Sequence, residues 1–557
     1  MSVTLSQVRK GAYYDSVVLM QLQRALLALP GISDAGAVMA TPVNLELLEA
    51  SELRPGEQPG PDDLLIVVRA DDQEAAQNAL AQVDELLSRR RTAPQGTFRP
   101  KSLEAAVRQL PDAAWVLVSV PGRFAAGVAQ EALRLGKNVF LYSDNVSVQD
   151  EVDLKRRAAD LGRLIMGPDC GTAIIGGVGF GFANRVRRGP IGLVGASGTG
   201  LQAVTSSIDT LGSGISQAIG TGGRDLHTEI AAGTTLQAID LLRRDPDTRV
   251  IVIVSKPPSP EVVGPVVAAA MATGKPTVVN LIGLPAGGHV RNLHFAATLE
   301  DAAALAVRLS EDPPTLEPAQ VASGGRRFLR GLFSGGTLAY ETVLRLQYVL
   351  QPLFSNVAIH PWQALTDPLR SQAHTVLDLG ADTFTVGRLH PMMDNDLRVR
   401  RLRQEAEDPE TSVILLDLVL GEGAHPDPAS ELAPAIRQAG GHGIQTVVAV
   451  IGTESDPQTL AEQVATLERS GATVKIGLEA ALETVVAALP LEARSIPVEV
   501  PLSVLDETPA TINVGLEGFA ESLAAQNAHV VHVDWRPPAG GDERLMGILA
   551  RMKGTQG

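Results

Sequence analysis

The stretch GPIGLVGASGTGLQAVTSSIDTLG, residues 189–212, sets an apolar run, a turn of small residues and a helical pattern in direct succession. A second stretch, RGLFSGGTLAYETVLRLQ at 330–347, has the same order, again with Ser-Gly, a further glycine and a threonine at the turn. In each half an Asp-Pro-acid-Thr tetrapeptide, at 245–248 and at 408–411, then directly precedes a wholly apolar run. An internal repeat of this kind predicts two related flavodoxin-like lobes that face one another.

Apolar runs and helical patterns also alternate upstream of the repeat. Runs such as AWVLVSV and NVFLY, separated by helical patterns, are typical of βαβ crossovers and of a parallel sheet. The sequence therefore predicts a multidomain α/β chain in five parts. These are a small α/β domain at 1–95, a parallel α/β unit at 96–187, the first lobe at 188–322, the second lobe at 323–492 and a C-terminal extension at 493–557.

Composition limits the function classes. Of the 557 residues, 45% are apolar and 20% are charged, which is ample for burial and argues against disorder. The formal net charge is −16, whereas proteins that bind nucleic acid or an anionic membrane typically present a basic surface. We therefore expect neither as a partner. The first residues contain no apolar signal segment and no long uncharged apolar run occurs elsewhere, so we expect a cytoplasmic protein.

The single cysteine, Cys170, excludes an internal disulfide and a metal cluster built on cysteines. It lies in the turn PDCGT with no His or Lys close in sequence, so we interpret it as a small turn residue rather than as a nucleophile. His289 and His294 lack further ligands at a suitable spacing, and the sequence predicts no metal site.

The turns of the repeat are the first candidate binding sites. Small residues let a backbone approach an anion closely, and a helix N-terminus presents N–H groups with a partial positive charge. The alternative is an ordinary strand-to-helix turn with a Ser or Thr cap. The occurrence of the same turn at equivalent positions in both lobes indicates a shared function, and we therefore favour phosphate binding. The candidate residues are Ser197, Gly198, Thr199 and Gly200 in the first turn and Ser334, Gly335, Gly336 and Thr337 in the second.

A glycine-rich loop follows the next predicted strand at the same sheet edge, where α/β proteins bind ligands. Gly222 and Gly223 offer backbone amides there, and Arg224 offers a cation suited to phosphate or carboxylate. The alternative is a plain turn with a solvated arginine. We favour the anion site.

Two loops of the second lobe occupy the equivalent edge. Arg388 and His390 lie in GRLHPMMD, which fits an anion clamp with a proton donor, or else a capped turn with solvated side chains. The other loop, GEGAHPD, contributes Gly421 and Gly423 as further backbone donors.

Several of these motifs resemble, in order, the α subunit of succinyl-CoA synthetase: MGPDCGTAIIGG, the Ser-Gly-Thr turn, GTGGRDL and the apolar run after DPDT. The unit at 96–187 resembles the CoA-binding domain of that family, and the second lobe is similar to its second ligase domain. KGAYYDSVVLM, GRLHPMMD and VVHVDWRPPAGG resemble FdrA proteins in particular. The resemblance implies a Rossmann-like CoA-binding-type domain followed by two flavodoxin-like succinyl-CoA-ligase domains.

In the resembled family, acyl-phosphate and phosphohistidine intermediates form between two ligase lobes, stabilised by helix N-termini. Carried over, these helices begin at 197–200 and near 421–427. The phosphorylated histidine of the family lies in a Gly-His-Ala-Gly loop, whereas this chain has PAGGHV at 285–290. His289 is the residue that would replace it, but we expect that no phosphohistidine forms. No ATP-grasp domain is present, so we do not expect an ATP-dependent ligase from this chain alone.

FdrA-type proteins are associated with allantoin and purine breakdown. The resemblance implies a subunit of an oxamate carbamoyltransferase, which converts oxalurate and phosphate to oxamate and carbamoyl phosphate. The alternatives are an acid–thiol ligase of the succinyl-CoA synthetase type, with His289 phosphorylated, and a non-catalytic scaffold. CoA and phosphate are the candidate ligands. The expected partners are other subunits of a hetero-oligomeric enzyme and small anionic substrates.

Overall fold

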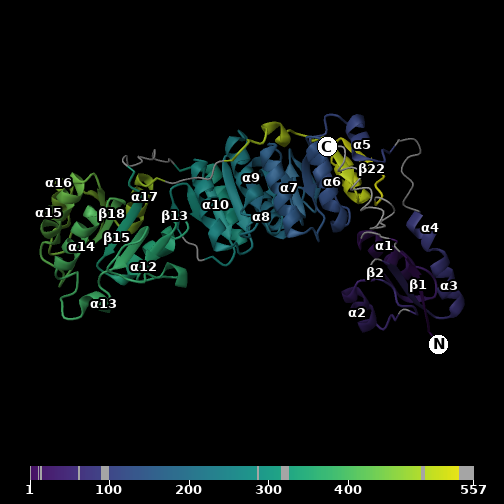
Figure 1. The fold of residues 1–557 in the computed structure, drawn as a ribbon, viewed down its shortest axis with the longest axis horizontal. Coiled ribbons are helices and arrows are strands. Elements are labelled where there is room, and N and C mark those ends of the chain that lie inside the picture. The colour runs from purple at the N-terminus through teal and green to yellow at the C-terminus, as the bar shows by residue number, and fades with distance from the viewer. Residues whose placement is uncertain are drawn as a thin grey trace, which may run out of the picture. The chain divides into compact units, whose positions relative to one another are not determined.

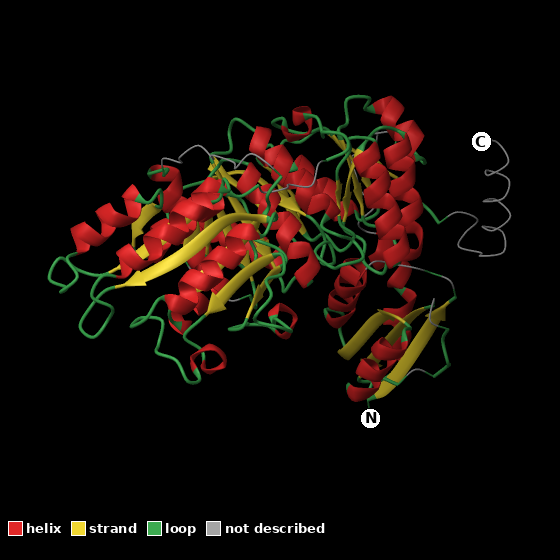
Figure 2. Cartoon of the chain, turned by 60° about the vertical axis from the view of Figure 1, so that its left-hand side comes forward, coloured by secondary structure: helices red, strands yellow, loops and turns green. Residues whose placement is uncertain are grey.

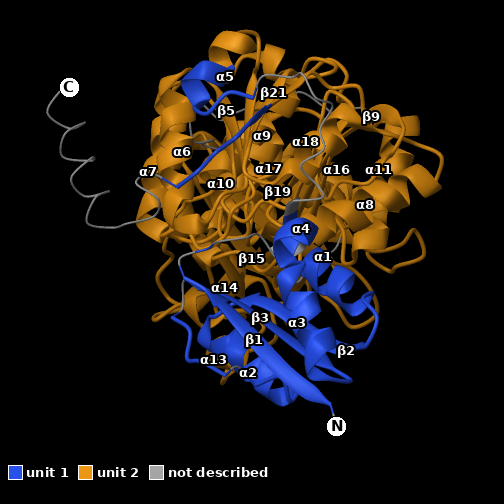
Figure 3. Cartoon of the chain, turned by 90° about the vertical axis from the view of Figure 1, so that its right-hand side faces the viewer, with its two compact units in different colours: residues 1–106, 532–557 blue, residues 107–531 orange. Residues whose placement is uncertain are grey.

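The computed structural model of the chain describes residues 2–10, 12, 16–54, 56–60, 63–88, 99–284, 288–314, 325–490 and 496–537. The chain forms two compact units, which are described separately (Figure 3). One consists of Met1–Ala106 with His532–Gly557, and the other of Val107–Val531. Among the described residues, no helix combines the length and the apolar character needed to cross a membrane.

The smaller unit, whose first residues are purple in Figure 1, contains an antiparallel sheet of order β1-β3-β2. The central strand, LLIVVRA, is buried on both faces, because helices α1 and α3 cover alternate residues and α2 covers the others. The elements are β1 (Val3–Arg9), α1 (Ser16–Leu27), β2 (Ile32–Met39), α2 (Pro42–Ala50), β3 (Leu64–Ala70), α3 (Gln73–Ala81) and α4 (Val83–Ser88).

The first lobe of the larger unit has five parallel strands in the order β10-β9-β11-β12-β14. In chain order this is 2-1-3-4-5, the flavodoxin-like arrangement. The strands are β9 (Arg188–Gly195), β10 (Ile215–Gly220), β11 (Val250–Ser255), β12 (Thr277–Leu281) and β14 (Leu293–Phe295), and the edges add β13 (His289–Val290), β7 (Thr172–Ile175) and β8 (Val178–Gly181). The helices are α8 (Gly198–Thr210), α9 (Gly233–Arg244), α10 (Pro260–Ala272) and α11 (Leu299–Glu311).

The second lobe repeats this topology with the order β17-β15-β18-β19-β20 and an extra edge strand, β16. The predicted flavodoxin-like repeat is therefore confirmed. The strands are β15 (Phe328–Phe333), β16 (Leu353–Ser355), β17 (His374–Asp378), β18 (Thr411–Val419), β19 (Gln445–Ile451) and β20 (Thr473–Ile476). The helices are α12 (Gly336–Leu346), α13 (Asp382–Thr385), α14 (Asp396–Glu407), α15 (Pro428–Gly441), α16 (Leu460–Arg469) and α17 (Leu478–Ala488).

A third sheet has the order β22-β21-β4-β5-β6, with β21 parallel to β4. Strands from the predicted C-terminal extension thus complete the sheet that begins after residue 96, a pairing that the sequence did not predict. Trp115, fully buried in β4, donates its indole N–H to the Val504 carbonyl oxygen at 3.0 Å and ties the two segments together. The elements are α5 (Leu103–Gln109), β4 (Trp115–Val118), α6 (Gly122–Arg134), β5 (Asn138–Leu141), α7 (Val148–Asp160), β6 (Ile165–Met166), β21 (Thr511–Val514), α18 (Glu517–Ala524) and β22 (Val530–Val533).

Figure 2 shows the alternation of helices and strands through the larger unit. The apolar strands are buried because helices cover the sheets, as the composition of runs such as VIVIVS in β11 predicts. In both lobes the strand order reverses beside the first strand, β9 or β15. Ligands of such sheets bind outside the carboxyl ends of the strands at this point, so the turns after β9 and β15 occupy the functional edge.

Candidate functional site

A pocket of about 220 Å³ lies at the carboxyl ends of β9, β10 and β11 in the first lobe. It is lined by residues 195–199, which include three of the four residues of the predicted turn but not Gly200, by the loop at 169–172 and by three glycines of the next loop, Gly220, Gly222 and Gly223. Phe182, Gln202 and Lys256 complete its wall. The structure therefore brings together three motifs that are separate in the sequence, at the point where the strand order reverses.

The turn before α8 presents donors to this pocket. Ser197 is the N-cap, and its Oγ accepts a hydrogen bond from the Gly200 N–H at 3.2 Å. The N–H groups of the first helical turn, at Gly198 and Thr199, have no partner within the helix. The Thr199 hydroxyl is exposed and makes no hydrogen bond to any described residue. Backbone and hydroxyl donors at a helix N-terminus are suited to a small anion.

Close packing explains the glycines of the neighbouring loop. A Cβ atom on Gly222, whose φ is +89°, would lie 2.4 Å from the Pro168 carbonyl oxygen. A Cβ atom on Gly220 would lie 2.3 Å from the Thr172 carbonyl oxygen. The loop at 167–172 thus rests directly on the backbone of the glycine loop. Cys170 is buried between them, and burial raises the pKa of its thiol to about 12, which agrees with a packing role.

Lys256 and Asp169 also line the pocket, and neither is among the predicted site residues. Lys256 directly follows β11, and its ammonium group forms no ion pair with a described residue. The available signal was a lysine directly after an apolar run of the first lobe, but its place beside the repeat turn depends on the pairing of β11 with β9.

Arg224, predicted as an anion clamp, points elsewhere. Its guanidinium donates to Glu151 Oε2 at 2.9 Å and to the Val146 carbonyl oxygen at 2.8 Å, and it does not line the pocket. Glu151 also pairs with Lys155, whose Nζ lies 2.6 Å from Asp225 Oδ1. Arg224 belongs to this largely buried ion cluster, so its guanidinium is already paired in the structure, and its role as an anion clamp stays a prediction.

The second repeat turn differs from the first. Ser334 is 1% exposed, and its Oγ donates to Asp417 Oδ2 at 2.6 Å instead of capping the helix. Gly335 is the N-cap of α12 and supplies no side-chain cap. Asp417 is itself held by Arg398 at 2.8 Å. The Ser334 hydroxyl is thus directed into the sheet edge and is not available to a ligand.

His390 lies close to this turn together with Asp378, an acid that is not among the predicted site residues. A Cβ atom on Gly380 would lie 2.8 Å from His390 Nε2 and 3.1 Å from Asp378 Oδ1. Burial raises the pKa of Asp378, and the nearby His390 opposes that shift. Arg388 is exposed, and its guanidinium has no partner among the described residues.

The last predicted loop, which contains Gly421 and Gly423, joins the His390 loop through a hydrogen bond from the His425 N–H to the Met392 carbonyl oxygen at 2.8 Å. Helix α15 begins after it at Pro428, with Asp427 as its N-cap. A hydrogen bond from Ser430 lowers the pKa of Asp427. The chain's own carboxylate therefore occupies the helix end predicted near 421–427 for an acyl phosphate.

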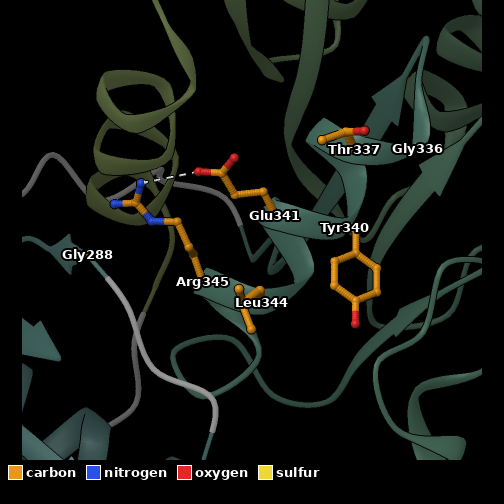
Figure 4. A pocket seen from close by; sticks show the side chains of 7 residues that line it. All are labelled: Gly288, Gly336, Thr337, Tyr340, Glu341, Leu344 and Arg345. Carbon is orange, nitrogen blue, oxygen red and sulfur yellow. Dashed lines mark ion pairs between the residues drawn. The ribbon is translucent and has the colours of Figure 1, made fainter. Parts of the chain in front are cut away.

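A second, open pocket of about 780 Å³ borders α12 and includes Gly336 and Thr337 (Figure 4). Gly288 from the first lobe lines it as well. The two repeat turns thus line different pockets. The first three residues of the predicted 285–290 loop lie outside the described residues.

His289 contacts the second lobe. Its Nδ1 lies 3.2 Å from Glu479 and its Nε2 3.7 Å from Glu483, both on α17. Its ring stacks on His294 with centroids 5.5 Å apart, and burial lowers the pKa of His294 to about 4. Both nitrogens of the predicted phosphorylation candidate therefore face carboxylates.

Comparison with known proteins places these features in a family. The chain is 39% identical to the uncharacterized protein YahF of Escherichia coli K12 over 485 residues, which are 83% of this chain and 94% of YahF. The chain belongs to the YahF family. Three domain families match parts of this chain. Residues 1–102 match the AllF heavy metal-associated domain, residues 186–282 the CoA-binding domain and residues 332–487 the CoA-ligase domain. The CoA-binding match falls on the first lobe, whereas the predicted CoA-binding unit is 96–187, and those boundaries stay a prediction.

More distant relatives of this YahF-family chain are subunits of CoA ligases. Succinate–CoA ligase [ADP-forming] subunit alpha 2 of Archaeoglobus fulgidus is 29% identical over 160 residues, which are 28% of this chain and 54% of that protein. The ADP-forming sulfoacetate-CoA ligase subunit SauD of Bilophila wadsworthia is 26% identical over 148 residues, 25% of this chain and 49% of that one. A solved acetyl-coenzyme A synthetase of Ca. Korarchaeum cryptofilum matches 71% of this chain and 85% of its own at 18% identity, with a TM-score of 0.30.

The heavy metal-associated domain does not fit a soft metal here. Thiolates are the ligands that select such metals, and residues 1–102 contain no cysteine, because the one cysteine of the chain is Cys170. Nor do the residues that the structure describes include a group of three or more His, Cys, Asp or Glu able to hold a metal ion.

Proposed function

We propose that this chain is the acyl-phosphate-handling subunit of a CoA ligase of the succinyl-CoA synthetase class and acts on a small carboxylate. One observation carries the proposal: the N-terminus of α8 and the unpaired ammonium group of Lys256 line one small pocket where the strand order reverses. An acyl phosphate is a small anion, and both groups favour an anion. The CoA-ligase match of the second lobe supports the same class.

In this proposal the phosphoryl oxygens accept hydrogen bonds from the Gly198 and Thr199 N–H groups and from the Thr199 hydroxyl. Lys256 supplies a full positive charge beside them. The backbone donors are held in place before the reaction by the cap of α8, so they stabilise the transferring group without rearranging. Transfer of the acyl group from the phosphate oxygen to an incoming thiol, with inorganic phosphate as the leaving group, would then depend on positioning and electrostatics rather than on a protein acid or base.

When bound, CoA supplies the thiol that accepts an acyl group in ligases of this class. The residues that would hold it include Phe182, whose side chain lines the pocket and is 52% exposed. Its ring packs edge-on against Tyr142 at the end of β5, with centroids 5.5 Å apart. The pocket loop reaches the same strand end, since the Asp169 N–H donates to the Ser143 carbonyl oxygen at 3.0 Å.

Carbamoyl transfer of the oxamate carbamoyltransferase type, as the FdrA resemblance implies, is the second candidate. The observation that favours it is His289, because Glu479 and Glu483 beside its two nitrogens oppose the approach of a phosphoryl anion. Carbamoyl phosphate is an acyl phosphate that needs no phosphohistidine, and it would use the same pocket. In either case we propose that other subunits complete a cytoplasmic enzyme.

Calorimetric titration with phosphate, carbamoyl phosphate and CoA tests the proposal. We expect phosphate to bind the wild type, and Lys256→Met to weaken it about tenfold or more, since hydrogen bonds to charged groups are worth about 1.5–3 kcal/mol. Ser206→Ala, on α8 but outside the pocket, is the matched control. Binding of CoA supports the ligase, and binding of carbamoyl phosphate without CoA supports carbamoyl transfer. If none of the three binds, the pocket is rejected and the scaffold is favoured.

A further inference from the structure

Phe182 lies at the boundary between the first-lobe pocket and solvent. Among the described residues that line this pocket, it is the one with a large apolar side chain, whereas the others are small or polar. The residue is 52% exposed, so one part of the side chain faces the pocket and another part faces water. The ring is therefore a wall between the two.

The loops of the pocket hold the backbone of Phe182. Its N–H donates to the Gly171 carbonyl oxygen at 2.8 Å, and its own carbonyl oxygen accepts a hydrogen bond from the side-chain amide of Gln202 on α8. The preceding residue, Gly181, has a φ of +69°, and a Cβ atom there would lie 2.3 Å from the same Gly171 oxygen. The backbone that carries the ring is thus in direct contact with a loop that lines the pocket.

A segment near the C-terminus holds the same region from outside the pocket. Gln526, which follows α18, makes two hydrogen bonds to Gly179 in β8: its Oε1 accepts from the N–H at 2.8 Å, and its Nε2 donates to the carbonyl oxygen at 3.0 Å. The ring centroid of Phe519 on α18 lies 6.1 Å from that of Phe182, and both rings pack edge-on against Tyr142, at 4.9 and 5.5 Å. Gln526 is 347 positions from Gly179, so residues distant in sequence fix the strand and the ring that border the pocket.

We infer that α18 and the residues after it position Phe182, and that Phe182 keeps water away from an acyl phosphate in the pocket. Gln526 and Phe519 are positioning residues, because they act through β8 and the aromatic contacts and do not line the pocket themselves. The inference rests on the proposed function and adds to it the element that protects the bound acyl phosphate.

An acyl phosphate needs this protection because water competes with the thiol. When the oxygen of water bonds to the acyl carbon, the bond from that carbon to the phosphate oxygen breaks, and the products are a carboxylate, inorganic phosphate and a proton. The donors at the start of α8 stabilise the departing phosphate in this reaction as well as in transfer to a thiol. Exclusion of water from the site prevents such hydrolysis.

The test follows the release of inorganic phosphate from acetyl phosphate by the full chain, with no thiol present. For the wild type we expect the rate found in buffer alone. Gln526→Ala loses two hydrogen bonds, which shifts the loop toward open forms and should raise the rate by about tenfold. Phe182→Ala removes the wall itself and should raise the rate at least as much, whereas Phe182→Tyr keeps the ring and should give a smaller gain. Adding Lys256→Met to either alanine variant should reduce the gain, because acetyl phosphate then binds more weakly.

Ser522→Ala, at an exposed position of α18, is the matched control and should release phosphate at the wild-type rate. A gain in rate separates positioning from general damage, because unfolding of the pocket would remove the site. Wild-type rates in both Gln526→Ala and Phe182→Ala overturn the inference. If inorganic phosphate still binds and depends on Lys256 in that case, the proposed function stands and only the inference is wrong. If the wild type binds neither phosphate nor acetyl phosphate, both are wrong.

Discussion

The two lobes share a strand order and a Ser-Gly turn, yet their turns face different chemistry. In the first lobe the Ser197 hydroxyl caps its own helix and the turn opens onto Lys256. In the second lobe the Ser334 hydroxyl is bound to Asp417, and Asp378 Oδ2 lies 3.0 Å from the Cβ position of Gly336. The first turn opens onto an unpaired lysine, although Asp169 also lines its pocket, whereas the second turn has the carboxylate of Asp378 beside it. The repeated motif determines the backbone, whereas residues at the ends of neighbouring strands determine what the backbone can bind.

Each turn is supported by a buried ion pair of different origin. In the first lobe, the pair joins Asp225, which follows the glycine loop, to Lys155 on α7, a helix that packs with the third sheet. In the second lobe, Arg398 and Asp417 both belong to the lobe itself. The anion pocket is therefore coupled to a neighbouring sheet, whereas the second turn is supported from within.

The largest expected effect is that of Lys155→Met, which tests this coupling. The substitution removes the cation shared by Glu151 and Asp225, both fully buried, so it leaves Asp225 without a cationic partner. We expect the free energy of unfolding to fall by about 3–5 kcal/mol, measured by urea denaturation. Arg156→Met, in an exposed pair with Asp153 one position along the same helix, should change it by less than about 1 kcal/mol. Equal effects of the two substitutions would show that the buried cluster does not support the lobe.

The glycine loops provide the second test. Gly222→Ala places a methyl group 2.4 Å from the Pro168 carbonyl oxygen at a φ of +89°, so the two pocket loops must separate. Gly423→Ala in the second lobe has a similar φ of +78° but no atom within 4 Å of the added methyl group. We expect about 1–2 kcal/mol of destabilisation from backbone strain alone in Gly423→Ala, and a larger loss, together with loss of phosphate binding, in Gly222→Ala. Circular dichroism melting and phosphate titration measure both. Similar results for the two variants would mean that the pocket tolerates the separation of its loops.

The sequence predicted the parts of the fold that depend on local pattern. Apolar runs such as VIVIVS and the two Ser-Gly turns indicate parallel strands and helix starts without any tertiary information. It could not predict that residues after 493 complete the sheet of Trp115, because the pairing of distant strands leaves no local signal.

The direction of a side chain also depends on residues that are distant in sequence, and this limited the prediction of the site. Arg224 and Ser334 stand in the motifs expected to bind anions, but Glu151 and Asp417, distant in sequence, hold their polar groups. Lys256 was overlooked because its role depends on the adjacency of β11 and β9. Motif recognition identified the loops, and only the packing between them shows which side chains remain available.

Paired serine substitutions give the third, smaller effect. Ser197→Ala removes the cap of α8 and should cost about 1 kcal/mol of stability, with weaker phosphate binding because a hydroxyl of the pocket is lost. Ser334→Ala removes one donor to the buried Asp417 and should cost about 1–3 kcal/mol without changing phosphate affinity. Thermal melting with and without phosphate separates these outcomes. A loss of phosphate affinity in Ser334→Ala would place the second turn in the binding site after all.

The smallest effect concerns pH and the acid that faces the second turn. Burial holds the pKa of Asp378 above its ordinary value of 3.8, so this carboxyl binds its proton more tightly in the folded than in the unfolded chain. Its contribution to stability is therefore fully present below pH 3.8 and is lost as the pH rises through the folded-state pKa. Asp378→Asn keeps an oxygen for the Gly380 N–H, which the acid accepts at 2.8 Å, and removes the titration.

Relative to the wild type, Asp378→Asn should gain stability steadily as the pH increases across that interval and then stay level. Urea denaturation at a series of pH values measures this difference. The matched variant is Asp382→Asn, an exposed acid at the start of α13, which should run parallel to the wild type. A gain that depends on pH identifies the second turn as a place that carries a destabilising negative charge at neutral pH, which is the property that separates it from the first. If the difference in the free energy of unfolding between Asp378→Asn and the wild type did not change with pH, that distinction would disappear. The second turn would then again be a candidate anion site.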